Sequence, residues 1–489
     1  MPKPNGRLTA HDSVFLYWER PEQPMHVAEC MVYDGHITAA DVIRMIDQRL
    51  HLLPRYVQKV IPAPFGLAHP MWVDDPDFDL SKHVDEREIP APGDDRALSR
   101  IVGELYCDLL DRDQPLWHVT VLHGLADGGT VLFIKLHHSM VDGVASVELI
   151  EVLHSTERGA SMATLPIERP DLQPLPGTVR RLTEALADNT QTVLDRARAL
   201  ADLRKPGQAR AAVKRLSTVA RTLVDIAPDM LSPLSPTPFN APIHAKRDFA
   251  WVEIPFEEVR EVKAALGGTV NDVVLAVLSG GLAAFMRRNG SDPDGRELSA
   301  LCPVSVRAPD QSGAGGNLIS MVVVPLYVGI DDPADRLNAE RQAMESLKER
   351  EQGVGFHELI SSAEWWPAPL YKALWKLWPR GYFPLHITST NVPGPRQPLF
   401  LGDHELLHWY PFGVQWTNNG LFLCTLSYRE NLILGPVSDP EVVTDVWEFA
   451  ADLRTAFDEL RAAAGLPSSS DAVAQRAKPP TRATGRRSP

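Results

Sequence analysis

The sequence predicts an α/β (α+β) fold in which two α/β units are joined by a long helical crossover. Strand-like and helix-like segments mix in residues 1–154 and again in residues 246–465, which are the two predicted units. The residues between them, 155–245, differ in composition and contain a long helical segment flanked by prolines. The chain has 489 residues and 44% hydrophobic content, which suffices for two or three separate cores.

The first unit ends on a strand, a tight turn and a helix. Before that point, apolar residues recur at helical spacing in 39–50 and 96–110. The segments HVTVLHGL and TVLFIKL are expected to be neighbouring strands, because the turn-prone ADGG joins them. A helical pattern, VASVELIEVLHS, begins directly after Gly143. The segment HHSMVDG therefore lies where a buried strand meets a helix, which is where open α/β sheets place their ligands.

The crossover combines proline-rich ends with a basic helical segment at about residues 178–227. The prolines at both ends indicate loops. Between residues 179 and 221, arginine and lysine clearly outnumber aspartate and glutamate. This positive charge suits anionic lipid head groups or the phosphates of a ligand, and the alternative is an ordinary solvated helix face.

The second unit contains further segments of both kinds. The most apolar stretch, 273–286, is too short to span a bilayer and is interrupted by Ser279, Gly280 and Gly281. The last residues, 466–489, are small, polar and proline-containing, and we expect them to form a disordered tail. The expected strands are 249–255, 298–306, 319–328 and 420–428, and the expected helices are 257–266, 269–288 and 333–351.

Composition argues against several classes of protein. The chain has 49 basic and 63 acidic side chains and a net charge of -14, which argues against a nucleic-acid partner. The N-terminus lacks the apolar core of a signal peptide. The cysteines lie far apart, at Cys30, Cys107, Cys302 and Cys424, so neither a disulfide framework nor a cysteine zinc site is expected, and we expect a reducing, cytoplasmic setting.

The adjacent histidines His137 and His138 are the candidate chemical groups. A neutral imidazole with a pKa near about 6.5 can accept a proton from an alcohol, although a lone histidine is more often a structural group. Adjacent side chains on a strand point to opposite faces, so only one of the two rings can face a ligand. Asp142 can fix a ring tautomer or anchor an arginine, and Gly143 permits a sharp turn and a close approach of substrate.

Two other chemistries are disfavoured at this motif. Histidines that face opposite ways cannot easily bind one ion, and the sequence has no HExxH spacing, so no metal site is expected. Ser139 follows the histidines, but the sequence has no GxSxG elbow, which argues against a covalent serine mechanism.

The segment HHSMVDG, residues 137–143, resembles the HHxxxDG motif of coenzyme-A-dependent acyltransferases and condensation domains. Further segments resemble, in order, those of the bacterial wax ester synthase/diacylglycerol acyltransferase family. This resemblance runs from about residue 8 to residue 465. The other segments that carry it are LTAHDSVFLYWERPEQPMHV, DFDLSKHV, PLW at 115–117, the Asn271–Asp272 pair, PVSVR with GNLIS, TNVPGP at 390–395 (with Thr390 for the usual serine) and LSYRENLILGPVSDP.

The resemblance implies two chloramphenicol-acetyltransferase-like domains with an active-site channel between them. It implies that His138 is the general base, which takes the proton of a substrate hydroxyl as its oxygen attacks the thioester of acyl-CoA. His137 and Asp142 are then supporting residues. Acyl-CoA is the implied co-substrate, and neither a bound cofactor nor an acyl-enzyme is expected.

Candidate substrate-binding residues come from two further motifs. Asn271 and Asp272 either shape the site from the second unit or cap a helix. Pro115, Leu116 and Trp117 either line the acyl channel or belong to the core, and the core interpretation is favoured. The prolines of TNVPGP restrict the conformations of that loop, and a rigid loop suits either a role at the site or a purely structural one.

The resemblance leaves two acceptors open: diacylglycerol, which gives triacylglycerol and is preferred here, and long-chain alcohols, which give wax esters. Both acceptors dissolve in membranes, so we expect a peripheral enzyme at the inner face of the plasma membrane or on lipid droplets. The segment 364–383 suits either a bilayer interface or a buried amphipathic helix. The five aromatic residues that suit an interface are Trp365, Trp366, Tyr371, Trp375 and Trp378.

Other classes of protein share parts of this pattern. A peptide-synthetase condensation domain normally sits beside carrier and adenylation modules, which this sequence lacks, and plant-type alcohol acyltransferases carry a DFGWG loop that is also absent. A catalytically silent protein that binds lipid or coats lipid droplets stays open as a third class. The intact His138, Asp142 and Gly143 favour an enzyme.

Overall fold

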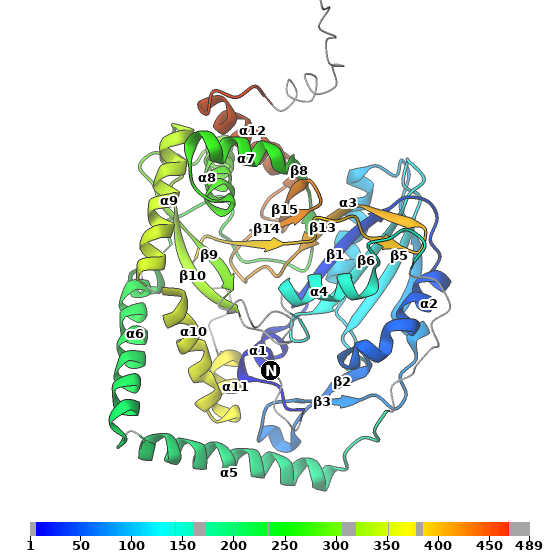
Figure 1. The fold of residues 1–489 in the computed structure, drawn as a ribbon, viewed down its shortest axis with the longest axis vertical. Helices are drawn as coiled ribbons and strands as arrows, with labels where there is room; N and C mark the ends of the chain where they lie inside the picture. The colour runs from blue at the N-terminus through cyan, green and yellow to red at the C-terminus, as the bar shows by residue number, and fades with distance from the viewer. Residues whose placement is uncertain are drawn as a thin grey trace, which may run out of the picture.

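The structure, a computed structural model, describes residues 6–141, 143–160, 172–202, 204–231, 234–305, 319–350, 352–377 and 385–468. Two large mixed sheets lie beside each other, each with helices packed on it, and two long helices border the molecule (Figure 1). The predicted α/β fold with two such units is confirmed. Most of the expected tail, 469–489, lies outside the described residues.

The first sheet is built around two strands that are buried along their whole length, β1 and β6. Both faces of the sheet are therefore covered, as the continuous apolar run TVLFIKL predicts. The strand order is β12-β13-β1-β6-β5-β4. The strands are β1 (His26–Tyr33), β4 (Val84–Glu88), β5 (Trp117–His123), β6 (Thr130–His137), β12 (Phe400–Leu401) and β13 (His404–Phe412), and the helices of this unit are α1 (Ala10–Trp18), α2 (Ala39–Arg49), α3 (Asp95–Cys107) and α4 (Gly143–Leu153).

The second sheet has the order β10-β9-β11-β14-β15-β7, and β8 also pairs with β15. A separate small sheet is formed by β2 (Gln58–Ile61) and β3 (Met71–Asp74). The strands of the second sheet are β7 (Asp248–Phe249), β8 (Val252–Pro255), β9 (Leu298–Ser305), β10 (Ile319–Leu326), β11 (Ile387–Pro393), β14 (Leu421–Tyr428) and β15 (Asn431–Ser438). The helices of this unit are α7 (Phe256–Leu266), α8 (Val270–Arg288), α9 (Pro333–Glu349), α10 (Gln352–Ser362) and α12 (Val446–Ala463). Helix α11 (Ala368–Leu377) packs against α1 of the first unit.

One strand of the first sheet comes from the far end of the chain. β13 pairs antiparallel with β1, with Ala28 opposite Phe412 and Met31 opposite Trp409. Residues 400–412 therefore belong in space to the first sheet, although they fall within the predicted sequence unit 246–465, so the chain crosses back from the second sheet to the first. The physical reason is that β13 covers an edge of β1 that would otherwise leave its backbone groups unpaired.

The predicted helical segment of the crossover consists of two helices, α5 (Thr178–Asp202) and α6 (Pro206–Leu231). Pro206 suits the first position of α6, where no backbone N–H is needed. α5 is held to the body by an ion pair of 2.6 Å between Arg7 Nε and Asp188 Oδ2. α6 packs against α10 (Figure 1).

The most apolar stretch of the sequence forms α8. In the part of the chain that the structure describes, α8 is the one helix long and apolar enough to cross a membrane, yet most of it is buried inside the protein. It packs against α7, α9 and α12. A side chain added at Gly281 would collide with Leu453, so the glycine permits this close helix packing. α8 is thus a core helix of the second unit.

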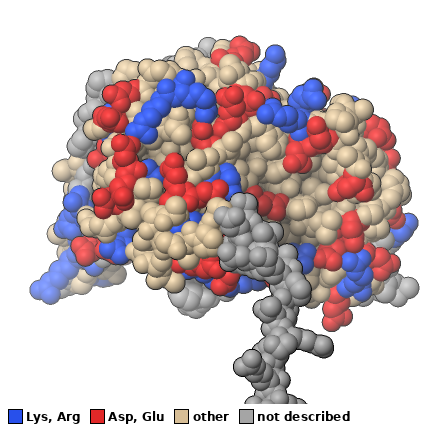
Figure 2. All heavy atoms as spheres, turned by 90° about the horizontal axis from the view of Figure 1, so that it is seen from above, with Lys and Arg blue, Asp and Glu red and all other residues tan. Residues whose placement is uncertain are grey.

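Charged side chains of both signs are interspersed over the face in Figure 2, which looks from above onto the view of Figure 1. No continuous basic patch covers this face.

Candidate active site

The histidine motif lies at the junction of the two units. β6 ends at His137 and α4 begins at Gly143, so the predicted order of strand, turn and helix is confirmed. α4 contacts β11 of the second sheet and lies between the two sheets (Figure 1). Asp142 lies outside the described residues, and its predicted supporting role stays a prediction.

The backbone of the turn is bound to its neighbours on both sides. His137 N donates to the carbonyl of Leu116 (3.0 Å), and His138 N donates to the carbonyl of Met25 (2.8 Å). Met140 N donates to the carbonyl of His137 at 2.9 Å. These bonds come from different segments, so the position of the turn is fixed before any side chain is considered.

The two histidine rings have separate surroundings, as strand alternation predicts. His137 is completely buried, whereas His138 is only half-buried. The His138 ring stacks on Phe15 of α1, with ring centroids 4.1 Å apart and planes within 7° of parallel. Its Nδ1 atom is buried and makes no hydrogen bond to another described residue. Of the two histidines, His138 is the one whose ring keeps exposed surface, so it is the one that a substrate can reach.

The tautomer of His137 follows from its contacts. The backbone N–H of Ser139 donates to Nδ1 of His137 at 3.1 Å, so this nitrogen carries no proton. In the neutral ring the proton then sits on Nε2, which lies 3.3 Å from Oε1 of Glu19. Nδ1 also lies 2.7 Å from the Ser139 hydroxyl. His137 is thus a structural histidine that holds the turn.

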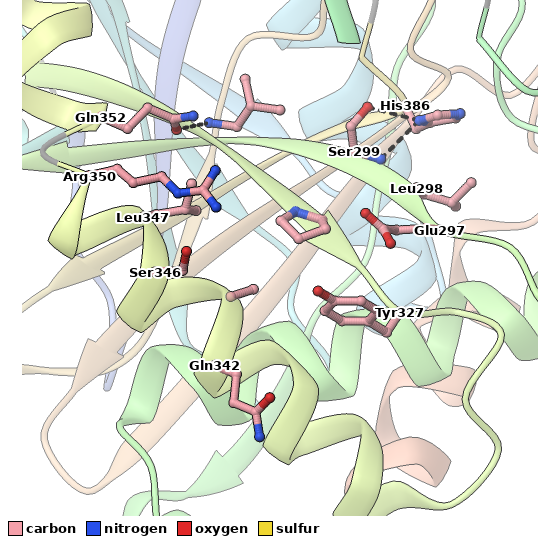
Figure 3. Close-up of a pocket in the computed structure, with 13 residues that line it drawn as sticks. Glu297, Leu298, Ser299, Tyr327, Gln342, Ser346, Leu347, Arg350, Gln352 and His386 are labelled. Carbon is pink, nitrogen blue, oxygen red and sulfur yellow. Dashed lines mark hydrogen bonds between the residues drawn. The ribbon is translucent and has the colours of Figure 1, made fainter. Parts of the chain in front are cut away.

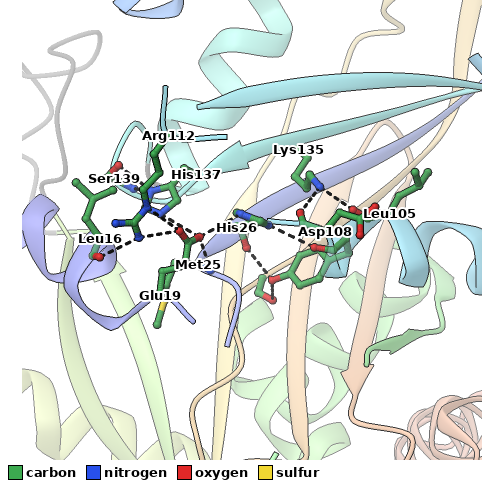
Figure 4. Close-up of polar contacts among 12 residues, drawn as sticks. Leu16, Glu19, Met25, His26, Leu105, Asp108, Arg112, Lys135, His137 and Ser139 are labelled. Carbon is green, nitrogen blue, oxygen red and sulfur yellow. Dashed lines mark hydrogen bonds and ion pairs between the residues drawn. The ribbon is translucent and has the colours of Figure 1, made fainter. Parts of the chain in front are cut away.

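Glu19 is the centre of a buried polar network that connects α1, β1 and β6 (Figure 4). Its Oε1 atom lies 3.2 Å from Nε2 of His26, and its Oε2 atom accepts from Nη2 of Arg112 at 2.8 Å. Burial by itself raises the pKa of Glu19, but hydrogen bonds from His137 and His26 outweigh it and hold that pKa well below its ordinary value. Glu19 is therefore an ionised carboxylate in the protein interior.

Sequence reasoning missed this network. Glu19 and His26 both lie in the opening segment that contributed to the family resemblance, LTAHDSVFLYWERPEQPMHV. No spacing within that segment indicates that they meet His137, because the contact depends on the pairing of β1 with β6, in which His26 lies opposite His137. The only available signal was the presence of a carboxylate and a histidine in a segment that the family shares.

The ring of His138 is neutral at physiological pH. Burial lowers the pKa of His138 to about 4, and the nearby His11 and His137 rings lower it further. A neutral imidazole has a free lone pair, so it can accept a proton from a hydroxyl group. This is the protonation state that a general base requires.

The PLW residues lie in the interior. Leu116 and Trp117 are buried, and Trp117 Nε1 donates to the carbonyl of Tyr56 at 2.8 Å. The Trp117 ring also stacks on His83, with centroids 4.4 Å apart. Pro115 is buried beside them. The core interpretation is therefore favoured over direct substrate contact, and Leu116 affects the site through its hydrogen bond to His137.

The Asn271–Asp272 pair divides into two roles. Asp272 forms a capping box with Thr269 at the start of α8, in which Thr269 N donates to its carboxylate at 2.7 Å. Asn271 is half-buried, and its side-chain oxygen accepts from Nδ2 of Asn391 at 3.4 Å. Asp272 is accounted for as a helix cap. Asn271 instead connects α8 to the TNVPGP loop that begins on β11.

A cavity of about 440 Å³ in the second unit is too polar for an acyl chain (Figure 3). It lies between β9, β10 and α9, and Arg350, Glu297 and Gln342 are among its lining residues. The buried His386 at its wall is already bonded, because its Nδ1 accepts from Ser299 N at 3.0 Å. Lipid chains need mostly apolar walls. All its lining residues come from the second unit and none from the histidine motif, so this cavity is separate from the site at that motif.

The comparisons with known proteins agree on one family. The wax ester synthase/diacylglycerol acyltransferase catalytic domain matches residues 8–274, and the C-terminal domain of the same family matches residues 315–461. A Mycobacterium tuberculosis protein that carries the name of a diacylglycerol O-acyltransferase is 32% identical over 479 residues, which cover 94% of this chain and 97% of the relative. The chain belongs to the wax ester synthase/diacylglycerol acyltransferase family. The predicted family is confirmed, and this family member is an acyltransferase.

Solved structures show the same fold. The wax ester synthase/diacylglycerol acyltransferase from Marinobacter aquaeolei VT8 aligns with a TM-score of 0.65 at 23% identity and covers 94% of this chain and 100% of its own. The first condensation domain of the calcium-dependent antibiotic synthetase aligns with a TM-score of 0.62 at 15% identity, covering 96% and 98%. The predicted architecture of two chloramphenicol-acetyltransferase-like domains is confirmed.

Proposed function

We propose that this acyltransferase makes triacylglycerol from diacylglycerol and a long-chain acyl-CoA, with His138 as the general base. The observation that carries the proposal is a neutral, half-buried imidazole on a turn that the protein holds rigidly. The name of the Mycobacterium tuberculosis relative favours diacylglycerol as the acceptor. A long-chain alcohol undergoes the same chemistry and would give a wax ester.

The reaction needs two proton transfers, one to His138 and one from it. His138 takes the proton of the diacylglycerol hydroxyl as its oxygen attacks the carbonyl carbon of the thioester. The tetrahedral intermediate then collapses, the C–S bond breaks, and the proton passes from the imidazolium to the sulfur of CoA. The new ester and free CoA leave, and His138 is neutral again. A general base of this kind is typically worth about 100- to 10,000-fold in rate.

The function is tested with purified protein, labelled palmitoyl-CoA and either diolein or hexadecanol. The proposal predicts labelled triacylglycerol from diolein. A product formed from hexadecanol but not from diolein would show that the acceptor is a long-chain alcohol instead of diacylglycerol. The proposed chemistry at His138 would be unchanged. If neither acceptor is acylated, the protein is better described as a lipid-binding protein.

The pH dependence of kcat/KM is expected to have an acid limb well below the ordinary histidine range. His138 acts as a base only when neutral, so activity is present above its pKa and is lost as the pH falls through about 4. The profile should be measured with a control in which each sample is returned to neutral pH, to show that the enzyme did not unfold. An acid limb near about 6.5 would mean that another group is the base.

We also propose that the enzyme works at the surface of the cytoplasmic membrane or of a lipid droplet, because its substrates dissolve there. In the tryptophan segment, residues 364–383, the side chains that can contact a membrane differ from those that its composition indicates. Tyr371 is buried, and Trp375 packs edge-on against Trp18 at 4.6 Å, so these two aromatic residues face the protein. Trp378 lies outside the described residues. On α11, the exposed apolar residues are instead Leu370 and Leu374, and Trp366 before the helix is exposed as well.

The turn that carries Phe65 and the adjoining helix α5 form a second part of the proposed lipid-binding surface. Phe65 is 88% exposed and adopts a left-handed backbone conformation (φ 55°), which is costly for a bulky side chain. The turn that carries it contacts α5, whose residues Val179 and Leu186 are also exposed. Arg180 and Arg198 of α5 are exposed too. Exposed apolar side chains next to arginines suit an anionic lipid surface.

A triple variant, Phe65→Ser with Leu186→Gln and Leu370→Gln, is expected to bind anionic vesicles at least several-fold more weakly than the wild type. The assay is flotation with phosphatidylglycerol-containing vesicles. Leu407→Gln, which removes an exposed leucine on β13, is the matched control and should float like the wild type. Equal flotation of the triple variant would show that this surface is not the lipid-binding one.

A further inference from the structure

The acyl transfer proposed above gives no role to Glu19, although this residue is a charged group in the interior. Its carboxylate is 2% exposed. Placing an isolated carboxylate in such an environment is costly by several kcal/mol unless partners compensate the charge. A buried charge directly beneath a functional loop therefore needs an explanation.

Every contact that the structure gives the Glu19 carboxylate comes from a hydrogen-bond donor. Oε2 accepts from both Nε (3.2 Å) and Nη2 (2.8 Å) of Arg112. Oε1 lies 3.3 Å from His137 Nε2 and 3.2 Å from His26 Nε2, and it also accepts from Met25 N at 3.4 Å. The Arg112 charge offsets the carboxylate charge, and Arg112 Nη2 also donates to the carbonyl of Leu16 at 2.9 Å.

His26 and His137 both present Nε2 to the carboxylate. Burial lowers the pKa of His26 to about 4, against the opposing effect of Glu19. A neutral His26 has one ring proton for two acceptors, the Glu19 carboxylate at Nε2 (3.2 Å) and the Tyr106 carbonyl at Nδ1 (3.3 Å). The proton is assigned to Nε2, because a charged carboxylate is the stronger acceptor. Because His26 and His137 lie opposite each other on β1 and β6, one carboxylate oxygen connects the two strands.

Glu19 also connects the two structures that flank His138. It directly follows α1, which carries the Phe15 ring that stacks on His138. Through His137 it is bonded to the turn itself, where Ser139 N donates to His137 Nδ1. We infer that Glu19 is the positioning residue of the histidine turn: it fixes the tautomer of His137 and holds α1 against that turn, so that His138 faces the substrate in one orientation.

This inference rests on the proposed role of His138, and it predicts a specific effect of Glu19→Gln. Glutamine has nearly the same shape, but one end of its amide is a donor. Since all the surrounding groups are donors, either orientation of the amide places N–H against N–H. A misplacement of about 1 Å at a reacting group is worth about 100-fold in rate. We therefore expect kcat to fall by about 10- to 100-fold while KM for palmitoyl-CoA stays within about threefold.

The matched control is Glu340→Gln. Glu340 is also a buried carboxylate, but it lies in the second unit, where it accepts from Ser279 Oγ at 2.6 Å and from Tyr327 N at 3.1 Å. The variant Glu340→Gln is expected to lower the melting temperature without changing kcat. Glu19→Asp, which keeps the charge on a shorter side chain, should recover part of the lost kcat.

The outcomes separate this inference from the proposed function. A loss of kcat in Glu19→Gln that Glu19→Asp partly restores and Glu340→Gln does not share supports the positioning role. Wild-type kcat in Glu19→Gln, measured beside an inactive His138→Ala, would overturn the inference and leave the base assignment intact. Equal losses of kcat in Glu19→Gln and Glu340→Gln would overturn it as well, because general destabilisation then explains both. Full activity of His138→Ala would instead remove the proposed function itself.

Discussion

Replacing His138 with alanine is expected to lower kcat by about 100- to 10,000-fold, which is the usual contribution of a general base. The fold should survive, because the described contacts of the ring are limited to stacking on Phe15 and the backbone bond from His138 to Met25 remains. The measurement is the initial rate of triacylglycerol formation, read together with thermal melting. A His138→Ala rate within about threefold of the wild type would exclude His138 as the base.

His137→Ala is the informative companion variant. It removes one of the donors to Glu19 and the acceptor of Ser139 N, so it should lower the melting temperature as well as kcat. His138→Ala should lower kcat alone. This difference separates a group that acts on the substrate from a group that holds the turn.

Replacing Trp409 with alanine is expected to lower the free energy of unfolding by about 3–5 kcal/mol. Trp409 is completely buried on β13, and its Nε1 donates to Oε2 of Glu29 on β1 at 2.6 Å. The substitution therefore opens a cavity and removes a donor from a buried carboxyl group. Burial raises the pKa of Glu29 to about 7, so part of this loss is relieved by protonation.

Denaturant unfolding measured at neutral pH tests this prediction. Because β13 belongs to the first sheet, we expect the loss in the transition that unfolds the first unit. Trp409→Phe keeps most of the packing and should recover more than half of the loss. A destabilisation below about 1 kcal/mol would mean that β13 contributes little to the first sheet.

The sequence predicted those features that depend on local patterns. The apolar run TVLFIKL predicted a strand buried on both faces, and β6 is such a strand. The alternation of side chains along a strand predicted that His137 and His138 have different surroundings, and they do. Asp272 stands at the start of an apolar helical segment, and this position alone predicted a helix cap as one of its two possible roles. The capping box is present.

Features that depend on pairing between distant segments could not be predicted. Nothing local in HELLHWYPF indicates that β13 joins the first sheet and not the second, since the choice is made by pairing with β1. The same pairing of β1 with β6 brings His26 to Glu19 and His137. The tryptophan segment shows a related limit: apolar residues on a helix predict that one face is covered, but not whether protein or lipid covers it.

In the proposed reaction, His138 activates the acceptor for direct attack on the thioester. Single-turnover mixing of the enzyme with labelled palmitoyl-CoA and diolein, quenched at successive times, tests it most directly when the wild type and His138→Ala are compared. We predict that label passes from CoA to triacylglycerol without appearing on the protein, and that this transfer is slowed by about 100-fold or more in His138→Ala. Label that first accumulates on the wild-type protein and then moves to triacylglycerol, or an undiminished rate in His138→Ala, would contradict it.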